Sequence, residues 1–112
     1  MNNDIKGFIK DAGSMTDLAY SALQHHNARM DEAEWGSRDY YWHKYQSYQA
    51  RAVMYEFMAK GREAAIKNVY NEFTAQHAAQ RKVARAEAEL HRLASAEHWE
   101  TAQAARVKWR EL

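Results

Sequence analysis

Residues 40–61 read YYWHKYQSYQARAVMYEFMAKG, and the rest of the fold is organised around this stretch. It holds seven of the chain's fourteen aromatic residues. Six of its residues recur at alternating steps of four and three, which places them on one side of an α-helix: Tyr41, Tyr45, Tyr48, Ala52, Tyr55 and Ala59. A second row runs beside the first: Trp42, Tyr45, Gln49, Val53 and Phe57. Because this face is broad, a single neighbouring helix would not cover it.

The composition favours long helices in a single domain spanning residues 1–112. The chain has no proline, four glycines and twenty-one alanines, so helix breakers are scarce and the best helix former is abundant. Leu, Ile, Val and Phe make up only about 13% of the residues, a share at which disorder has to be considered. The net charge of only +1 and the eleven Trp and Tyr residues argue instead for a folded chain with an aromatic core. Such a core is small, and small domains of this kind often gain stability from a partner or from self-association.

Local start and stop signals divide the chain into helices. We expect a short helix over 4–12 that ends at Gly13, and longer helices over about 15–34, 38–60, 62–94 and 96–110. Gly36 can take the left-handed conformation that ends a helix, and Ser37 is a suitable N-cap for the next one, so the helices over 15–34 and 38–60 should form a hairpin. The helix formers around Gly61 fit either a break or a weak point inside one helix, and we expect the break.

The helix expected over 62–94 would be ~50 Å long, which is longer than a compact domain of this size needs. It would therefore project from the body or pair with a neighbouring chain. Its apolar face becomes polar at Gln76, His77 and Gln80, and it resumes at Val83, Ala86, Leu90 and Leu93 or Ala94. A continuous helix from there to the carboxyl end fits the residues equally well. The expected fold is all-α, an antiparallel helical bundle with a helix hairpin and a long, partly projecting third helix.

The sequence shows no pattern typical of an enzyme, a cofactor site or a metal site. No serine stands in a glycine elbow, no pair of glycines forms a phosphate-binding loop, and there is no cysteine to act as a nucleophile. The six histidines include no pair at the three- or four-residue spacing that lets two side chains of one helix bind the same ion. We therefore expect no catalytic residue, no cofactor and no metal. His26 falls in an apolar stripe and should lie in the core or in an interface.

Nothing in the sequence directs the chain to a membrane or out of the cell. The absence of cysteine gives no sign of secretion. The amino-terminal residues MNNDIKGFIKDAG contain no apolar run long enough for a signal peptide or a membrane span. We expect a cytoplasmic protein without a membrane partner.

The aromatic residues fit two different roles. Tyr and Trp fill cores that lack aliphatic side chains, and they are also enriched at protein interfaces. We expect the row Tyr45, Tyr48, Ala52 and Tyr55 to face the core. The candidates for a protein interface gather near the tip of the hairpin: Trp35, Tyr40, Tyr41, Trp42 and Tyr45. Tyr45 is therefore a candidate both for the core and for the interface.

The arginines near the carboxyl end suggest a nucleic-acid site as an alternative. Five of them form a basic face that could contact phosphates: Arg81, Arg85, Arg92, Arg106 and Arg110. Glu87 and Glu89 interrupt this face, and their charge would repel a nucleic-acid backbone. A solvated helix surface is therefore the simpler explanation.

The function expected from the sequence is non-enzymatic protein–protein interaction. The chain would be a self-assembling subunit that forms a homo-oligomer, or a small inhibitor or adaptor that docks on a larger protein. Small, cysteine-free helical chains are typical of bacterial and phage accessory proteins, including virion components and inhibitors of host defence. By this analogy the chain is of phage or mobile-element origin and acts in the host cytoplasm or the virion. Nucleic-acid binding through residues 81–110 is the alternative.

Overall fold

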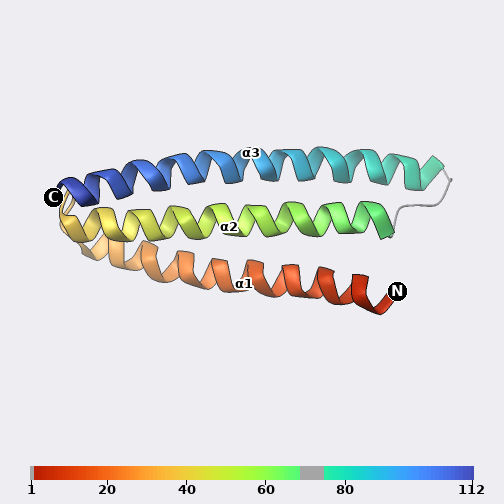
Figure 1. The fold of residues 1–112 in the computed structure, drawn as a ribbon, viewed down its shortest axis with the longest axis horizontal. Helices are drawn as coiled ribbons and strands as arrows, with labels where there is room; N and C mark the ends of the chain where they lie inside the picture. Colours follow the sequence, from red (N-terminus) through yellow and green to blue (C-terminus); the bar gives the residue numbers. More distant parts are fainter. Residues whose placement is uncertain (1, 69–74) are drawn as a thin grey trace.

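Three long helices make up the fold. The computed structural model describes the backbone of residues 2–68 and 75–112 and the side chains of residues 13–67 and 78–112. The helices are α1 (Asn2–Glu32), α2 (Arg38–Asn68) and α3 (Ala75–Glu111). Figure 1 shows them packed antiparallel, with α2 between α1 and α3. The chain is all-α, as expected, and α1 and α2 form the predicted hairpin.

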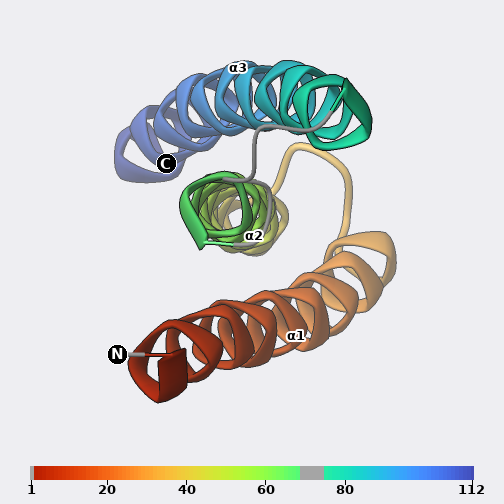
Figure 2. The ribbon, with the colours of Figure 1, turned by 90° about the vertical axis from the view of Figure 1, so that its right-hand side faces the viewer.

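The three helices form an open arrangement. Within the described residues, α2 packs against both α1 and α3, whereas no Cα atom of α1 comes within 8 Å of a Cα atom of α3. In Figure 2, where α2 is seen end-on, α1 and α3 lie on opposite sides of it. The molecule measures 56 × 24 × 19 Å and has a radius of gyration of 17.4 Å, compared with about 13 Å for a compact chain of this length. The broad face of α2 is thus covered by two neighbours, not one.

The turn between α1 and α2 forms as the sequence predicts. Gly36 has a φ of 80°, in the left-handed region where a side chain would be strained. The Ser37 Oγ accepts a hydrogen bond of 3.2 Å from the backbone N–H of Tyr40, and the Ser37 carbonyl accepts one of 3.1 Å from the N–H of Tyr41. Ser37 is therefore the N-cap of α2. At the other side of the turn, α1 ends at Glu32 and not at residue 34.

The expected breaks at Gly13 and at Gly61 are wrong, and of the two possibilities left open for residues 94–96 the structure shows the continuous helix. The segments 4–12 and 15–32 belong to one continuous α1, α2 runs through Gly61, and α3 runs through residues 94–96. A glycine inside a helix costs only about 1 kcal/mol relative to alanine. Neither Gly13 nor Gly61 takes a positive φ or is followed by a proline. Nothing at either position is strong enough to end the helix.

The single helix expected over 62–94 is also wrong. Residues 62–68 complete α2 and residues 75–94 belong to α3, while residues 69–74 lie outside the described part of the chain. With 37 residues α3 is nevertheless the longest helix of the three. Figure 1 shows that its first turn reaches beyond the end of α2, so the third helix does project in part.

Small side chains form the core. No described side chain larger than serine is fully buried, and Ser47 is the largest that is. Small residues at a helix contact allow the two axes to approach closely. Larger side chains then lie at the margins of the contact, where they stay partly exposed. The buried residues are Ala19, Leu23, Ser47, Ala50, Ala52, Ala59, Ala84, Ala88, Ser95, Ala102 and Ala105.

Two buried serines link the helices to one another. The Ser95 hydroxyl of α3 donates a hydrogen bond of 2.8 Å to the Ala52 carbonyl of α2. The Ser47 hydroxyl of α2 donates to the Oδ1 atom of Asn27 in α1. Because buried hydroxyls are costly without partners, these bonds favour the observed positions of the helices along one another.

The row Val83, Ala86, Leu90 and Leu93, which the sequence marks as an apolar face of its helix, does not pack on α2. All four residues are exposed. The face of α3 that meets α2 consists mainly of alanines. The tyrosines of α2 explain this choice, because Tyr48 and Tyr55 pack beside His98 of α3 and the fully buried positions are left to small residues.

Candidate functional site

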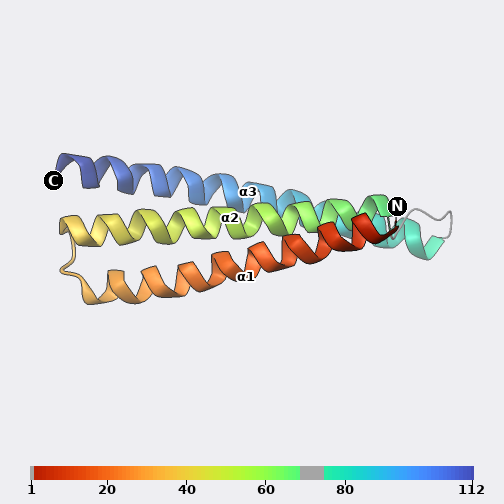
Figure 3. The same ribbon diagram turned by 60° about the horizontal axis from the view of Figure 1, so that its bottom comes forward.

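The five aromatic residues that the sequence marks as an interface lie at one end of the molecule. Trp35 lies in the α1–α2 turn, and Tyr40, Tyr41, Trp42 and Tyr45 lie on the first turns of α2. Figure 3 shows that the carboxyl end of α3 lies beside the start of α2, at the same end of the molecule as the α1–α2 turn. It brings in a sixth ring, Trp109. We call these six residues the aromatic end.

The rings of the aromatic end form two groups. In the first, the Trp35 and Tyr40 ring centroids are 6.1 Å apart, and Tyr41 meets Tyr40 edge-on at 5.2 Å. In the second, Trp42 lies 5.9 Å from Tyr45 and 5.0 Å from Trp109. Because each residue of a helix turns by about 100°, Tyr40 and Trp42 point in directions about 160° apart around α2. The two groups therefore lie on different sides of this helix.

Cations lie over three of these rings. The Arg38 guanidinium is 4.8 Å from the centroid of the Trp109 ring, and that of Arg106 is 5.8 Å from the Tyr45 ring. The Lys44 ammonium is 5.9 Å from the Tyr40 ring. Each such contact contributes about 0.5–1 kcal/mol at an exposed site. The second group is thus held mainly by contacts within the chain.

Trp35 differs from the other rings because it is 79% exposed. Among the described aromatic rings, its indole contacts only that of Tyr40, and most of the Trp35 side chain is exposed to solvent. Exposed tryptophans at such positions are the side chains that most often carry the affinity of a protein interface. Trp42, by contrast, connects α2 to α3 through Trp109. Of the five candidates, Trp35 is the one best placed to bind a partner.

Trp109 is the member of the aromatic end that sequence reasoning missed. Its distance along the chain from Trp42 conceals the contact between them. The available signal was topological: antiparallel packing places the end of α3 beside the start of α2. A tryptophan in the last turn of α3 should then reach the first turn of the hairpin's second helix.

The middle of the α2–α3 contact combines tyrosines with histidines. The Tyr55 ring centroid lies 5.8 Å from His91 and 5.4 Å from His98, and Tyr48 lies 5.7 Å from His98. Burial lowers the pKa of His98, the charge of Arg51 lowers it further, and Glu97 acts in the opposite direction. His98 is therefore mainly neutral at pH 7 and packs as an aromatic ring. Tyr48 and Tyr55 face another helix, as the sequence predicts, but remain only half-buried.

His26 of α1 and His43 of α2 form a second polar link in the hairpin. Their Nδ1 atoms are 3.0 Å apart, so one ring donates its N–H to the other. Burial lowers the pKa of His26, and the charges of His43 and His25 lower it further. Among the described side chains, no three His, Cys, Asp or Glu residues lie close enough together to hold a metal ion. The pair thus joins α1 to α2, and His26 lies where the apolar stripe predicts.

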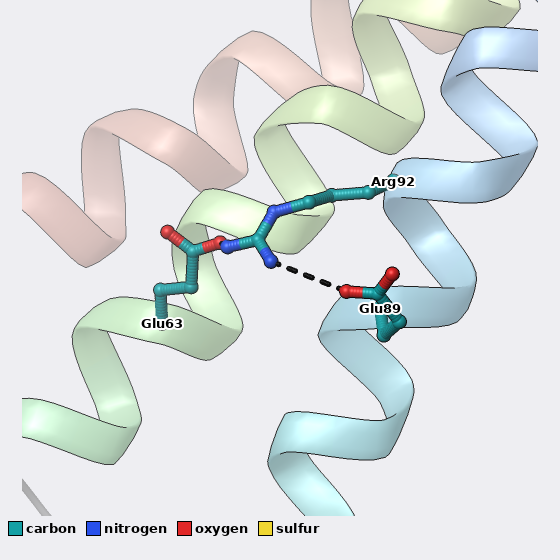
Figure 4. A network of polar contacts seen from close by, with 3 residues as sticks. All are labelled: Glu63, Glu89 and Arg92. Atoms are coloured by element: carbon teal, nitrogen blue, oxygen red, sulfur yellow. Dashed lines mark hydrogen bonds and ion pairs between the residues drawn. The ribbon is translucent and has the colours of Figure 1, made fainter.

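The five candidate arginines lie on one side of α3. At about 100° per residue they fall within about 60° of one another around the helix axis. Arg92, however, pairs with Glu63 of α2 and with Glu89, the latter at 3.5 Å. Figure 4 shows its guanidinium reaching across to α2 between the two carboxylates. Arg106 lies over the Tyr45 ring. Two of the five arginines are therefore already engaged within the chain.

A groove of about 360 Å³ runs between α1 and α2 on one face of the molecule. Its walls are largely apolar, with Met15, Leu18 and Ala22 from α1 and Val53 from α2. Gln49 of α2 adds a polar group. Exposed apolar surface of this kind often marks a place where another protein binds. The sequence did not single out this groove, because it arises only when the two helices pack.

None of the helices in the described part of the chain has an apolar stretch long enough to cross a membrane. No model of a protein family matches the chain, and neither a curated protein nor a solved structure matches it. The function has therefore to be argued from the surfaces described above.

Proposed function

We propose that this chain is a non-enzymatic protein–protein interaction component, either a self-assembling subunit or a small inhibitor or adaptor that docks on a larger protein. The observation that supports this most is the distribution of side-chain sizes. No described side chain larger than serine is fully buried, whereas Leu18, Trp35 and Leu90 are mostly exposed. Removing such apolar surface from water is the main driving force of protein association. A cytoplasmic location and a phage or mobile-element origin belong to this proposal and rest on composition and analogy.

The total surface area supports the same proposal. The chain exposes 7684 Å², whereas a compact monomer of its mass exposes about 6,400 Å². The difference, about 1,300 Å², exceeds the roughly 800 Å² that each partner buries in a protein–protein interface of ordinary size. A surface of this extent would be covered, at least in part, by another protein.

Three apolar areas are available for binding: the aromatic end with Trp35, the α1–α2 groove with Leu18, and the exposed row of α3 with Leu90. The charges around them are mixed, and the net charge is only +1. We therefore expect association to depend on apolar contact and to change little with salt, because screening acts on charge pairs between exposed groups.

Photo-crosslinking in the native cells tests this proposal. A benzoylphenylalanine introduced at Trp35 or at Leu90 should give a discrete protein adduct, because both sites lie on apolar surface. Gln24, an exposed polar position on α1, is the matched control and should give none. If neither Trp35 nor Leu90 forms a protein adduct, the proposed function is wrong.

Nucleic-acid binding is a second candidate, favoured by the alignment of the five arginines on one side of α3. Arg81, Arg85 and Arg110 form no ion pair with the described residues and could contact phosphates. Trp99 lies on the same side of the helix and could stack on a base. The pairing of Arg92 with two carboxylates weakens this candidate, because it places negative charge in the middle of the row.

Charge reversal at Arg85 tests the second candidate. Lys108→Glu is the matched control, because Lys108 is exposed on a different side of the same helix. If the row binds nucleic acid, Arg85→Glu should weaken the binding of a labelled oligonucleotide at least tenfold and Lys108→Glu should not. Binding should also fall steeply between 50 and 200 mM salt. Equal effects of the two variants, or no binding at low salt, would rule out this candidate.

A further inference from the structure

The exposed row of α3 is the most unusual apolar surface of the molecule. Val83 is 57% exposed, Leu90 65% and Leu93 54%, and Ala86 between them is also exposed. The opposite side of the helix carries the alanines that meet α2, and the two sides lie about 140° apart. We call Val83, Ala86, Leu90 and Leu93 the outer row. Because α3 packs its small residues against α2 and leaves its large apolar residues in solvent, we expect this apolar face to be buried against a second partner.

The spacing of the outer row is that of a coiled coil. Steps of three, four and three residues give positions a, d, a and d of two heptads, starting with Val83 at position a. Ala79 occupies the preceding d position. Glu97 and Glu100 occupy the next a and d positions and end the apolar row. The apolar segment over 79–93 is about 22 Å long.

We propose that the outer row pairs with the outer row of a second copy of this chain, in parallel and in register. This inference rests on the proposed protein-binding function and names the partner and the surface. Because the same row lies on both copies, each a position meets its own equivalent and each d position does likewise, as in parallel two-stranded coiled coils. Glu97 would then face Glu97 of the other copy, and this repulsion would limit the pairing to the segment before it.

Charge at the edges of the row supports a second copy in the parallel orientation. Lys82 occupies a g position and Glu87 the following e position, so Lys82 of one copy would face Glu87 of the other. Glu87 also pairs with Arg62 of its own α2 at 2.9 Å, which holds the carboxylate at this edge. In the antiparallel orientation, Glu87 and Glu89 of both copies would gather at the centre of the pair. Their like charges would oppose it.

The strength of the pairing follows from its size and from the state of the helix. α3 is already helical through its contact with α2, so pairing does not require the helix to form. Four side chains per copy cover less than the roughly 800 Å² per partner of a standard interface. We therefore expect a dissociation constant in the micromolar range, on the order of 10 µM, typical of small interfaces.

The experiment measures the mass of the full chain by light scattering and sedimentation over a range of concentrations. Wild type should rise from 13.1 kDa to twice that value. Leu90→Lys should raise the dissociation constant at least tenfold. Tyr20→Lys is the control, because Tyr20 is 50% exposed on α1 and does not line the α1–α2 groove, and it should leave the constant unchanged. Leu93→Lys is a second test in case Leu90→Lys reduces helicity by circular dichroism.

A single cysteine tests the orientation. The chain has no cysteine, so Ala79→Cys supplies its only thiol. In the parallel pair this d position meets its equivalent, and mild oxidation should give a disulfide-linked dimer, whereas Gln24→Cys should not. In an antiparallel pair residue 79 would instead lie near Glu97. Failure of Ala79→Cys to cross-link while wild type is dimeric would overturn the parallel register.

Three results would overturn the whole inference. They are a wild-type chain that stays monomeric at all concentrations, Leu90→Lys and Leu93→Lys variants that both associate as tightly as wild type, and equal weakening by Tyr20→Lys. None of these would by itself refute the proposed function. An adduct between residue 35 and another protein would then still show protein binding at the aromatic end.

Discussion

Replacement of Gly61 by alanine tests whether α2 is one continuous helix. The sequence allows a break or a weak point at this position, and these two possibilities predict changes in stability of opposite sign. In the structure Gly61 lies inside α2 without a positive φ, and an added methyl group would meet no atom within 4 Å. Alanine would therefore fit without a clash, and it would reduce the conformational entropy of the unfolded chain.

The expected effect of Gly61→Ala is a gain of about 1 kcal/mol in the free energy of unfolding. This value is the difference in helix propensity between glycine and alanine, about 0.8–1 kcal/mol. Burial adds little, because the new methyl group has no neighbours in the open space around it. In a domain of this size the gain corresponds to a rise in Tm of roughly 4 °C. Gly13→Ala, in an equally open position of α1, should give a similar increment.

Thermal unfolding followed by circular dichroism measures this change. All variants should be compared at one protein concentration, because association raises Tm. Gly36→Ala is the control of opposite sign: its φ of 80° strains any side chain, so alanine there should cost about 1–2 kcal/mol. If Gly61→Ala lowers Tm as Gly36→Ala does, α2 is interrupted at residue 61 and the description of the helix is wrong.

Two further predictions concern the core and its response to pH. Ala52→Leu should destabilise the chain by about 1–3 kcal/mol in urea unfolding, because Ala52 is fully buried at the α2–α3 contact and a larger side chain forces the helices apart; Ala28→Leu, at an exposed position of α1, should be near neutral. Stability should fall as the pH is lowered through about 6.5, the ordinary pKa of histidine. The pKa of His26 is lowered in the folded state, so the unfolded chain binds more protons in this range and acid favours unfolding. His26→Gln should make the dependence shallower, and a stability that rises between pH 7.5 and 5.5 would contradict this account.

Local chemistry is the part of the fold that could be predicted from the sequence. The turn at Gly36 and Ser37 needs only a residue that tolerates a positive φ and a side chain that caps the next helix, and both act within a few residues. The all-α class and the hairpin follow from the lack of proline and from this short turn. The helix boundaries at Gly13 and Gly61 could not be predicted, because a penalty of about 1 kcal/mol does not decide between a break and a continuous helix.

Which side of α3 is buried could not be predicted either. Its sequence contains two stripes, one with Val83 and Leu90 and one with Ala84 and Ala88. Hydrophobicity alone favours the stripe with the larger side chains. The structure buries the alanines, because the half-buried tyrosines of α2 pack beside His98 and the fully buried positions are left to small residues. This choice depends on the shape of the partner helix, which no pattern within α3 reveals.

The candidate site shows the same difference between local and distant information. The sequence pointed to Trp35 and Trp42 because they lie near a recognisable turn. It could not reveal that Trp109 packs on Trp42, or that His43 is hydrogen-bonded to His26. These contacts join residues far apart in the chain, and they change the roles of the residues involved. Trp42 becomes part of the α2–α3 contact, which leaves Trp35 as the more exposed candidate.

The separation of small and large side chains on α3 implies that stability and association can be changed independently. Ala102 meets α2, whereas Leu90 lies on the outer row and contributes little to the monomer. At concentrations where wild type is monomeric, Leu90→Lys should therefore unfold at nearly the same temperature as wild type, within about 2 °C, since surface substitutions usually change stability by less than 0.5 kcal/mol. At concentrations where wild type is dimeric, its Tm should rise above that of Leu90→Lys, because pairing stabilises only the folded chain. If Leu90→Lys is much less stable even as a monomer, Leu90 is a core residue, and the outer row is not a surface kept for a partner.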